Sequence, residues 1–304
     1  MPSSPKRIVV AINPSASFGS RGETGPRVVE ALVADGHDVE ALTEVDFVSL
    51  RAAVARAVDA RGESPADALV VVGGDGMVSL AVNLLAETSV PFGIIPSGTG
   101  NDMARGLGIP LDSVDDALAL LRRSLDRPAR TIDAGRIHHA EGVTWFGCVL
   151  SAGFDALVNE RANGMRWPRG ASRYVIALLA ELATLRARSY ELVVDGVAST
   201  ERASLIAVAN NRSLGGGMMV TPDAIIDDGL LDLFRVSPLS RLRFLRLFPK
   251  VFSGSHTKLS VVDISRVSRV RIDAADVIAY ADGERVGPLP VEVEVVPGAL
   301  RIFA

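Results

Sequence analysis

Three short stretches combine glycines with asparagine or a single acid, and each follows an apolar run directly: NPSASFGSRG (13–22), GGDG (73–76) and PSGTGND (96–102). Glycine lets the backbone turn sharply and lets phosphate oxygens approach backbone N–H groups. A helix that starts behind such a turn adds unsatisfied N–H donors and the positive end of its dipole. The combination predicts a nucleotide phosphate site built mainly from backbone.

The acids of these stretches indicate what else they could bind. Asp75 and Asp102 are suited to hold a divalent cation or a ribose hydroxyl. No lysine follows a glycine in this chain, no G-x-G-x-x-G lies between the first strand and helix, and the protein-kinase signatures are absent. Phosphate charge must therefore be met by backbone, arginine or Mg²⁺. The structural alternative is tight packing at these turns, with Asp102 as a helix cap and Asn101 as a turn residue.

Apolar runs alternating with helical spacing must position these stretches. Strands are expected over 7–12, 38–43, 67–72 and 91–96, and helices over 25–36, 46–60, 77–87 and 114–125. This alternation predicts a doubly wound parallel sheet. In such a sheet ligands bind beyond the carboxyl ends of the strands, where all three stretches fall.

After residue 130 the pattern changes to valine, isoleucine and threonine runs separated by turns such as DG (195–196), DDG (227–229) and DGE (282–284). These turns are typical of hairpins, so this part should be mainly antiparallel β. Helices are expected over 169–188 and 238–253. We therefore expect a nucleotide-binding α/β domain over 1–130 and a β-rich domain over 131–304, and the last strand can belong to either.

Charge and cysteine content indicate which partners and which cellular compartment are expected. The formal net charge of −4 gives no electrostatic reason to expect a nucleic-acid partner. The lone Cys148 cannot form an intramolecular disulfide, which favours the reducing cytoplasm. No apolar run reaches the roughly 18 residues of a spanning helix, so membrane contact would be peripheral, at the inner face. The sequence is compatible with a homodimer and does not fix the oligomeric state.

The ordered set of motifs resembles the diacylglycerol kinase catalytic-domain family, in its soluble bacterial lipid-kinase branch, which is related to sphingosine and ceramide kinases. Besides GGDG and PSGTGND, the matching stretches are NP (13–14), IDAG (132–135), SAGFDALV (151–158), VANNRSLGGGMMVTPDAIIDDGLLD (208–232) and YADGERV (280–286). The resemblance implies an NAD-kinase-like α/β domain followed by an antiparallel β-sandwich domain for the lipid substrate.

The resemblance also implies site residues. ATP, as co-substrate, would be bound at Asn13, Thr43, Gly73, Gly74, Asp75, Gly76, Met77, Ser79, Gly98, Thr99, Asn101 and Asp102. Asp75 is implied to orient ATP and Mg²⁺, and Glu284 to be the general base that takes the lipid hydroxyl proton. A further Mg²⁺ would be held by Asp228 and the main-chain oxygens of Ile225 and Leu230.

The types of these residues suit phosphoryl transfer and metal binding independently of the resemblance. Phosphoryl transfer needs mainly charge neutralisation and in-line positioning, and a carboxylate can take the acceptor proton. Hard oxygen ligands around Asp228 suit Mg²⁺ or Ca²⁺. The alternative is that DDGLLD and DGE are ordinary acidic hairpin turns.

Two departures from the family pattern leave alternatives open. Met77 stands where a hydroxyl residue is usual, and Leu80 stands where an acid is common. Because Met77 cannot donate to phosphate, that contact must be missing or supplied by another residue such as Ser79. We expect an ATP- and Mg²⁺-dependent kinase acting on the hydroxyl of a diacylglycerol-like lipid. The alternatives are another small-molecule kinase, such as an NAD kinase, and a non-catalytic nucleotide- or lipid-binding protein.

The lipid partner would be met at the membrane surface. SRLRFLRLFPKVFSG (240–254) interleaves basic and bulky apolar residues, as an interfacial helix does. The alternative is that its apolar residues are core and its arginines a solvated rim. RANGMRWPRGASRY (161–174) is a second, weaker candidate.

Overall fold

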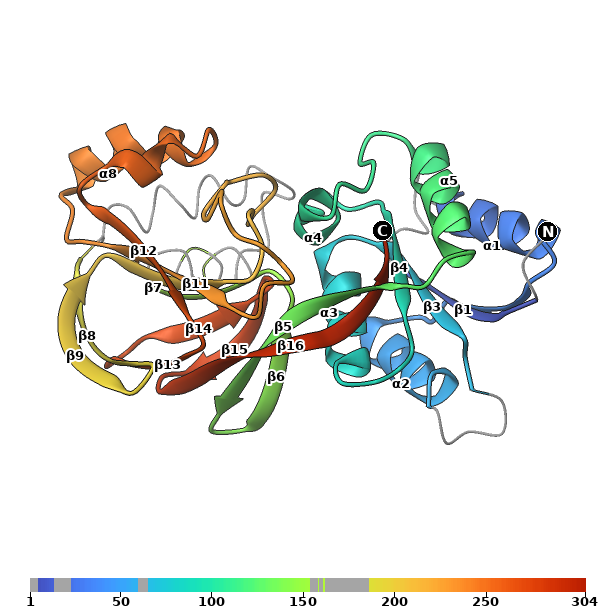
Figure 1. Cartoon of the computed structure of the whole chain (residues 1–304), viewed down its shortest axis with the longest axis horizontal. Helices are drawn as coiled ribbons and strands as arrows, with labels where there is room; N and C mark the ends of the chain where they lie inside the picture. The colour runs from blue at the N-terminus through green and yellow to red at the C-terminus, as the bar shows by residue number, and fades with distance from the viewer. Residues whose placement is uncertain (1–4, 14–22, 60–64, 154–157, 159–160, 162–185) are drawn as a thin grey trace. The chain divides into compact units, whose positions relative to one another are not determined.

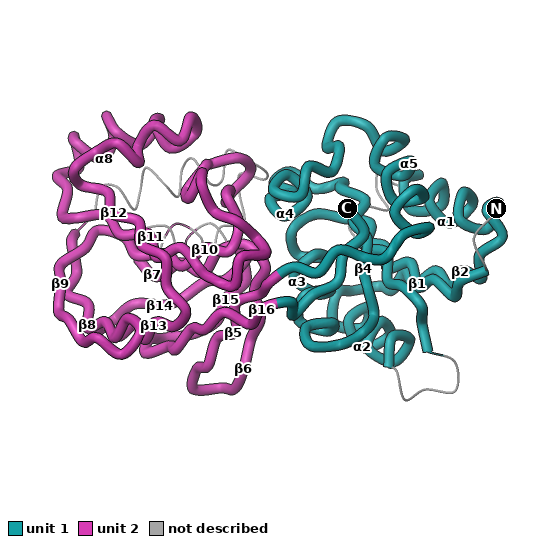
Figure 2. The backbone as a smooth tube through the Cα atoms, viewed as in Figure 1, with its two compact units in different colours: residues 1–132, 298–304 teal, residues 133–297 magenta. Residues whose placement is uncertain are grey.

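The computed structural model describes residues 5–13, 23–59, 65–153, 158, 161 and 186–304. Two compact units make up the chain: residues 1–132 with 298–304, and residues 133–297 (Figure 2). The glycine-rich stretch from residue 14 to 22 and the segment 162–174 lie outside the described residues. So does the helix expected over 169–188, except at its end, where Arg188 begins a strand instead.

The first unit alternates strands and helices (Figure 1). Its elements are β1 (Arg7–Ile12), α1 (Thr24–Ala34), β2 (Asp38–Leu42), α2 (Phe47–Ala57), β3 (Ala68–Gly73), α3 (Asp75–Leu85), β4 (Phe92–Pro96), α4 (Asp102–Gly106) and α5 (Val114–Leu125). The strands pair in parallel in the order β2-β1-β3-β4. Every residue of β3 is buried, as expected for a central parallel strand covered on both faces. The predicted doubly wound sheet is confirmed.

Helix α3 begins two residues earlier than the sequence suggested. Gly74 is its N-cap, with φ −101° and ψ −160°, and Asp75 is already helical. The glycines on both sides of Asp75 favoured a loop, yet only Gly74 leaves helical geometry. Asp75 therefore stands in the first turn of a helix, where the dipole favours a negative charge.

The second unit is a sandwich of two antiparallel sheets. Its elements are β5 (Arg130–His139), β6 (Gly142–Phe146), β7 (Val149–Gly153), β8 (Arg188–Val194), β9 (Val197–Ala203), β10 (Leu205–Ala209), β11 (Leu231–Val236), α8 (Arg241–Leu247), the 3₁₀ helices η2 (Phe248–Val251) and η3 (Ser255–Lys258), β12 (Val262–Val267), β13 (Arg269–Asp273), β14 (Ile278–Ala281), β15 (Glu284–Pro288) and β16 (Val291–Phe303). One sheet runs β12-β11-β10-β7-β14-β15, and the other contains β16-β13-β8-β9 with the β5–β6 hairpin. Their inner faces share one apolar core, which includes Leu150, Ile206, Leu233, Val270 and Val293.

The last strand, β16, takes part in both units. Its first half pairs antiparallel with β13, for example Val293 with Val270. Near its end, Ile302 pairs in parallel with Phe92 of β4. The sequence left the assignment of this strand open because its apolar pattern suits either sheet.

The helix expected over 238–253 is shorter than the pattern suggested. Helix α8 ends at Leu247 and a 3₁₀ turn containing Pro249 follows. Proline lacks an N–H and its ring clashes with the preceding turn, which explains the break. Across the described residues, no helix has both the length and the apolarity needed to cross a bilayer.

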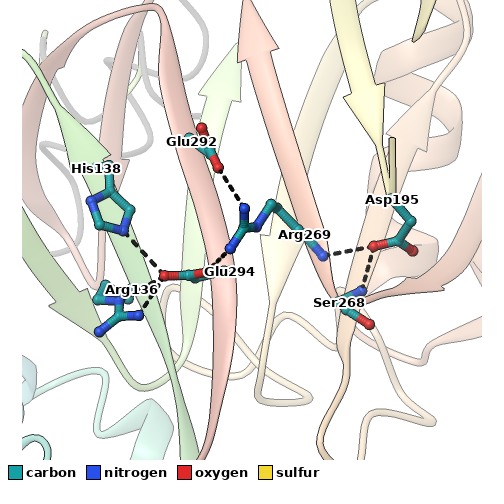
Figure 3. A network of polar contacts seen from close by, with 7 residues as sticks. All are labelled: Arg136, His138, Asp195, Ser268, Arg269, Glu292 and Glu294. Carbon is teal, nitrogen blue, oxygen red and sulfur yellow. Dashed lines mark hydrogen bonds and ion pairs between the residues drawn. The ribbon is translucent and has the colours of Figure 1, made fainter. Parts of the chain in front are cut away.

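Glu294 on β16 is the centre of a polar network on the second unit (Figure 3). Its carboxylate accepts a hydrogen bond from Arg136 Nε at 2.8 Å, contacts His138 Nε2 at 3.2 Å and pairs with Arg269. Burial alone would raise the pKa of Glu294. The hydrogen bonds from these three partners outweigh burial and lower the pKa to about 2.

Replacing Glu294 by glutamine is expected to lower the free energy of unfolding at neutral pH by about 2 kcal/mol. The full shift in the pKa of Glu294 corresponds to a larger free energy. We expect a smaller loss because Arg269 is 59% exposed and its ion pair is screened by solvent. Because the folded-state pKa is lowered from 4.5, this stabilisation is complete above pH 4.5 and disappears as the pH falls toward 2. Urea denaturation of both proteins across that range measures it.

The matched control is Glu292→Gln, since Glu292 has only a 3.4 Å contact with Arg269. We expect this variant to stay within about 0.5 kcal/mol of the wild type. A stability difference between Glu294→Gln and the wild type that does not change with pH would show that packing, and not ionisation, is responsible.

Candidate functional site

The carboxyl ends of three neighbouring strands meet at one edge of the first unit's sheet. The Asn13 N–H, just after β1, donates to the Val72 carbonyl of β3 at 3.1 Å, and the Ser97 N–H, just after β4, donates to the Gly73 carbonyl at 2.9 Å. A Cβ on Gly73 would lie 3.4 Å from the Cβ of Asn13. The structure therefore brings Asn13, GGDG and PSGTGND together at the edge where a ligand is expected.

Asp75 ties the two glycine-rich stretches to each other. Its Oδ2 accepts a hydrogen bond from the Asn101 N–H at 2.9 Å, and its Oδ1 accepts one from the Asp102 N–H at 2.7 Å. Burial, followed by the nearby charge of Asp102, raises the pKa of Asp75, and the two backbone hydrogen bonds oppose that rise. The carboxylate thus links the start of α3 to the start of α4 by hydrogen bonds.

Glycine is required where the two stretches touch. A Cβ on Gly98 would lie 2.4 Å from the Cα of Gly74, and a Cβ on Gly100 would lie 2.2 Å from Oδ2 of Asp75. Asn101 adopts the left-handed conformation, with φ +55°, and its side chain both accepts from the Gly98 N–H and donates to the Gly98 carbonyl. The edge is therefore a packed assembly of backbone around one carboxylate.

Two other residues predicted for ATP are buried, and a third is exposed at the carboxyl end of the neighbouring strand β2. Met77 is 1% exposed and packs under Gly73, where a Cβ would come within 2.3 Å of the Met77 Cγ. Ser79 is buried as well. Thr43 is exposed directly after β2, whose Leu42 pairs with Ala11 of β1, so it lies at the same carboxyl edge as Asn13. Thr99 is exposed as well, on the stretch that follows β4.

The burial of Met77 gives its apolar side chain a structural explanation. Leu80 is 4% exposed on the same helix and is also part of the core of the first unit. Both departures from the family pattern therefore fill space between α3 and the sheet.

In the second unit, Glu284 follows a tight turn that is anchored from inside. Asp282 and Gly283 have φ values of +49° and +86°, and Glu284 is exposed at the start of β15. The buried carboxylate of Asp282 accepts three backbone hydrogen bonds, from Gly147 at 2.8 Å, Cys148 at 3.0 Å and Val149 at 2.9 Å. Asp282 therefore fixes the hairpin that presents Glu284.

Sequence reasoning missed this role of Asp282. An Asp-Gly pair between two strands is the usual sequence of a two-residue hairpin, and it does not reveal whether the aspartate is buried. The one available signal was the apolar run VIAYA (277–281) directly before the turn.

A chain of hydrogen bonds continues from this anchor toward the DDGLL turn. Asn210 Nδ2 donates to the carbonyls of Gly147, at 3.2 Å, and Asp133, at 2.9 Å. Asp133 donates its own N–H to the Ile226 carbonyl, and its Oδ2 accepts from the Gly229 N–H at 2.6 Å. The hairpin that carries the predicted base and the predicted metal turn are thus connected by one network of hydrogen bonds.

Asp228 lies in that turn with its carboxylate already engaged. Its Oδ1 accepts from the Leu230 N–H at 3.1 Å, and its Oδ2 pairs with Arg266 at 3.1 Å. Ile225 is 43% exposed two residues before the acidic pair. Within the described ranges, no three His, Cys, Asp or Glu side chains are grouped so that they could hold a metal ion.

The donor set of this turn still fits a hard cation in part. Burial raises the pKa of Asp232, and the charges of Asp228 and Asp223 raise it further, while Arg266 lowers it. The turn therefore gathers several carboxylates, and carboxylate and carbonyl oxygens are the donors that Mg²⁺ prefers. Main-chain oxygens would have to complete the ligand set.

For the base that the resemblance implies at Glu284, replacing Asp282 by asparagine is expected to lower the kinase turnover rate by about 10- to 100-fold, because Glu284 loses its fixed position. One buried N–H of Gly147–Val149 would also lose its acceptor, which costs about 2 kcal/mol of unfolding free energy. Steady-state kinetics and urea denaturation of the variant measure both. Unchanged kinetics in a destabilised protein would show that Asp282 has only a structural role.

The comparisons with known proteins cover nearly the whole chain. Residues 7–137 match the family described as diacylglycerol kinase catalytic domain, and residues 148–304 match the YegS C-terminal NAD kinase beta sandwich-like domain. A diacylglycerol kinase from Mycobacterium tuberculosis is 41% identical over 299 residues, which are 98% of this chain and 94% of the relative.

Solved structures agree on the fold. A diacylglycerol kinase from Bacillus anthracis superposes with a TM-score of 0.71 at 20% identity, covering 98% of this chain and 96% of that one. An NAD kinase from Archaeoglobus fulgidus, in complex with ATP, gives a TM-score of 0.57 at 15% identity over 98% of this chain and 93% of that one. The 41% identical relative, with the two family matches, shows that the chain belongs to the diacylglycerol kinase catalytic-domain family.

Proposed function

We propose that this lipid kinase transfers the γ-phosphate of ATP to the hydroxyl of a diacylglycerol-like lipid and forms a phosphatidic-acid-like product. The proposal depends on one observation. The hydrogen bonds of Asp75 and the close packing of Gly98 and Gly100 join the two glycine-rich stretches at the sheet edge. The 41% identical relative named diacylglycerol kinase supports the choice of acceptor.

ATP would be bound mainly by backbone in the first unit. Gly74, the N-cap of α3, provides no side-chain cap, and the positive end of the helix dipole at this terminus attracts phosphate. Because Met77 and Ser79 are buried, this binding does not need a hydroxyl at position 77. That supports the kinase over the non-catalytic alternative, which rested on Met77 and Leu80.

Mg²⁺ is part of the proposal. Asp75 and Asp102 at the sheet edge, and Asp228 with the main-chain oxygens of Ile225 and Leu230, are the residues that would hold it. When bound, the cation supplies neutralisation of phosphate charge.

Glu284 would act on the acceptor. Its exposed carboxylate takes the proton of the lipid hydroxyl as the hydroxyl oxygen forms its bond to the γ-phosphorus, and the bond from that phosphorus to the β,γ-bridging oxygen breaks to release ADP. Asp282 holds Glu284 at the start of β15 and acts only through it.

The test is radiolabelled ATP with the purified full chain and separate acceptors: diacylglycerol, sphingosine, ceramide and NAD. We expect label in a phosphatidic acid. Label in NAD or in a sphingoid lipid alone would overturn the proposed acceptor. ATP binding by calorimetry, with no labelled product from any acceptor, would favour the non-catalytic alternative.

A further inference from the structure

One surface of the second unit combines exposed leucines with uncompensated positive charge. It consists of residues 240–252, called here the α8 segment, which connect β11 to β12 along the chain. The segment lies on the outside of the unit (Figure 1). Leu242 is 82% exposed, Leu245 50% and Phe252 55%. Large apolar side chains this exposed, gathered in one short segment, indicate an interaction surface.

The α8 segment is attached to the rest of the unit at Phe244 and Val251, and its aromatic side chains pack on one another. Phe244 is buried, stacks on Phe248 at 5.7 Å between ring centroids, and Phe248 meets Phe252 edge to face at 6.0 Å. The Met219 N–H donates to the Val251 carbonyl at 2.9 Å. The exposed leucines therefore lie on an anchored segment.

Helix geometry places apolar and basic residues on the same outer face. At 100° per residue, Leu242 and Arg246 point away from buried Phe244, and Leu245 and Arg243 flank them at about 100° from Phe244. These arginines and Lys250 are exposed, and within the described residues none pairs with a carboxylate. A core helix with a solvated rim would bury Leu242 and Leu245, whereas both are exposed in the structure.

Positive charge is concentrated in the sequence around this face. Residues 236–262 contain five lysines and arginines and no aspartate or glutamate. This is a formal charge of +5 in a chain whose net formal charge is −4, so the remaining residues carry −9. Such a segment complements a negatively charged surface while the rest of the chain is repelled by it.

We infer that the α8 segment is the docking surface for an anionic lipid bilayer. Leu242, Leu245 and Phe252 enter the boundary between headgroups and acyl chains, and the arginines and Lys250 contact lipid phosphates. The inference deepens the proposed function, because a kinase of membrane lipids must meet its acceptor at a bilayer. A second copy of this chain fits less well, since its own α8 segment would bring positive charge against positive charge.

The experiment is co-sedimentation of the full chain with vesicles, without ATP and without diacylglycerol. Vesicles of phosphatidylcholine alone are compared with vesicles containing about one third phosphatidylglycerol. The wild type is expected to bind only the anionic vesicles, and binding should weaken as salt is added.

Two variants separate the contributions of charge and apolar contact. Each basic residue near an anionic leaflet contributes about 1 kcal/mol, or roughly fivefold, so Arg241→Gln/Arg243→Gln/Arg246→Gln should weaken binding about 100-fold. Leu242→Ser/Leu245→Ser should weaken it by a similar factor, about tenfold for each leucine.

A matched control comes from the start of α2, where Val45 is 90% and Val48 79% exposed. This patch contains Glu44 and Asp46, so it lacks the charge to attract an anionic bilayer. Val45→Ser/Val48→Ser should therefore bind vesicles as the wild type does.

Three results would overturn the inference. They are a wild type that ignores anionic vesicles, α8 variants that bind as the wild type does, and α8 variants that change the oligomeric state in solution while vesicle binding stays constant. Phosphorylation of a short-chain diacylglycerol dissolved below its micelle concentration should be unaffected in both α8 variants. Loss of all kinase activity in the wild type, with vesicle binding intact, would refute the proposed function and leave the docking surface standing.

Discussion

Glu284→Gln is expected to lower the turnover rate of lipid phosphorylation by about 10²- to 10⁴-fold, which is the usual contribution of a general base. Glutamine keeps the size and hydrogen-bonding shape of the side chain but cannot take the acceptor proton. Because Glu284 is exposed and its side chain makes no hydrogen bond within the described residues, the unfolding free energy should stay within about 0.5 kcal/mol. ATP affinity should not change, since all the residues proposed to bind ATP lie in the first unit.

The measurements are initial rates with saturating ATP, ATP titration calorimetry and urea denaturation. Glu141→Gln is the control, because Glu141 is another exposed acid at a hairpin turn of the same unit. It should leave the rate unchanged. A Glu284→Gln enzyme with more than half of the wild-type rate would remove Glu284 from the role of base.

The architecture was predictable because its signals are local. Strand–helix alternation before residue 130 predicted the α/β unit, and hairpin turns after it predicted the β-rich unit. The turns at 195–196 and 282–284 are found as expected. The errors lie at helix ends. Gly74 and Gly76 suggested a loop where α3 already begins, and Pro249 ended α8 earlier than its apolar spacing indicated.

The residues that hold the candidate site together were harder to predict. Asp75 contacts backbone 26 and 27 residues later in the chain, and Asp282 contacts backbone more than 130 residues earlier. A single sequence shows that an acid is present but does not show which distant N–H groups it satisfies. The same holds for Met77, whose role depends on the space left by Gly73.

Asp75→Asn is expected to damage both binding and stability. The amide offers only one acceptor to the two N–H groups of Asn101 and Asp102, and its NH₂ would face the other donor. A buried donor without an acceptor costs about 1–3 kcal/mol, partly offset because the neutral amide avoids burying a charge. We expect a loss of about 2 kcal/mol in the free energy of unfolding. Displacement of the two stretches should lower the rate with limiting ATP at least 100-fold.

The pH dependence gives Asp75 a sharper test. Burial and the charge of Asp102 raise its pKa above 3.8, so it protonates at a higher pH than an ordinary aspartate and then loses an acceptor for one N–H. ATP affinity of the wild type should therefore fall as the pH drops toward that raised pKa. Asp102→Asn removes the repelling charge, lowers the pKa of Asp75 and should move this fall to lower pH. If calorimetric titrations show the same acid limb in wild type and Asp102→Asn, Asp75 is not the group whose protonation weakens ATP binding.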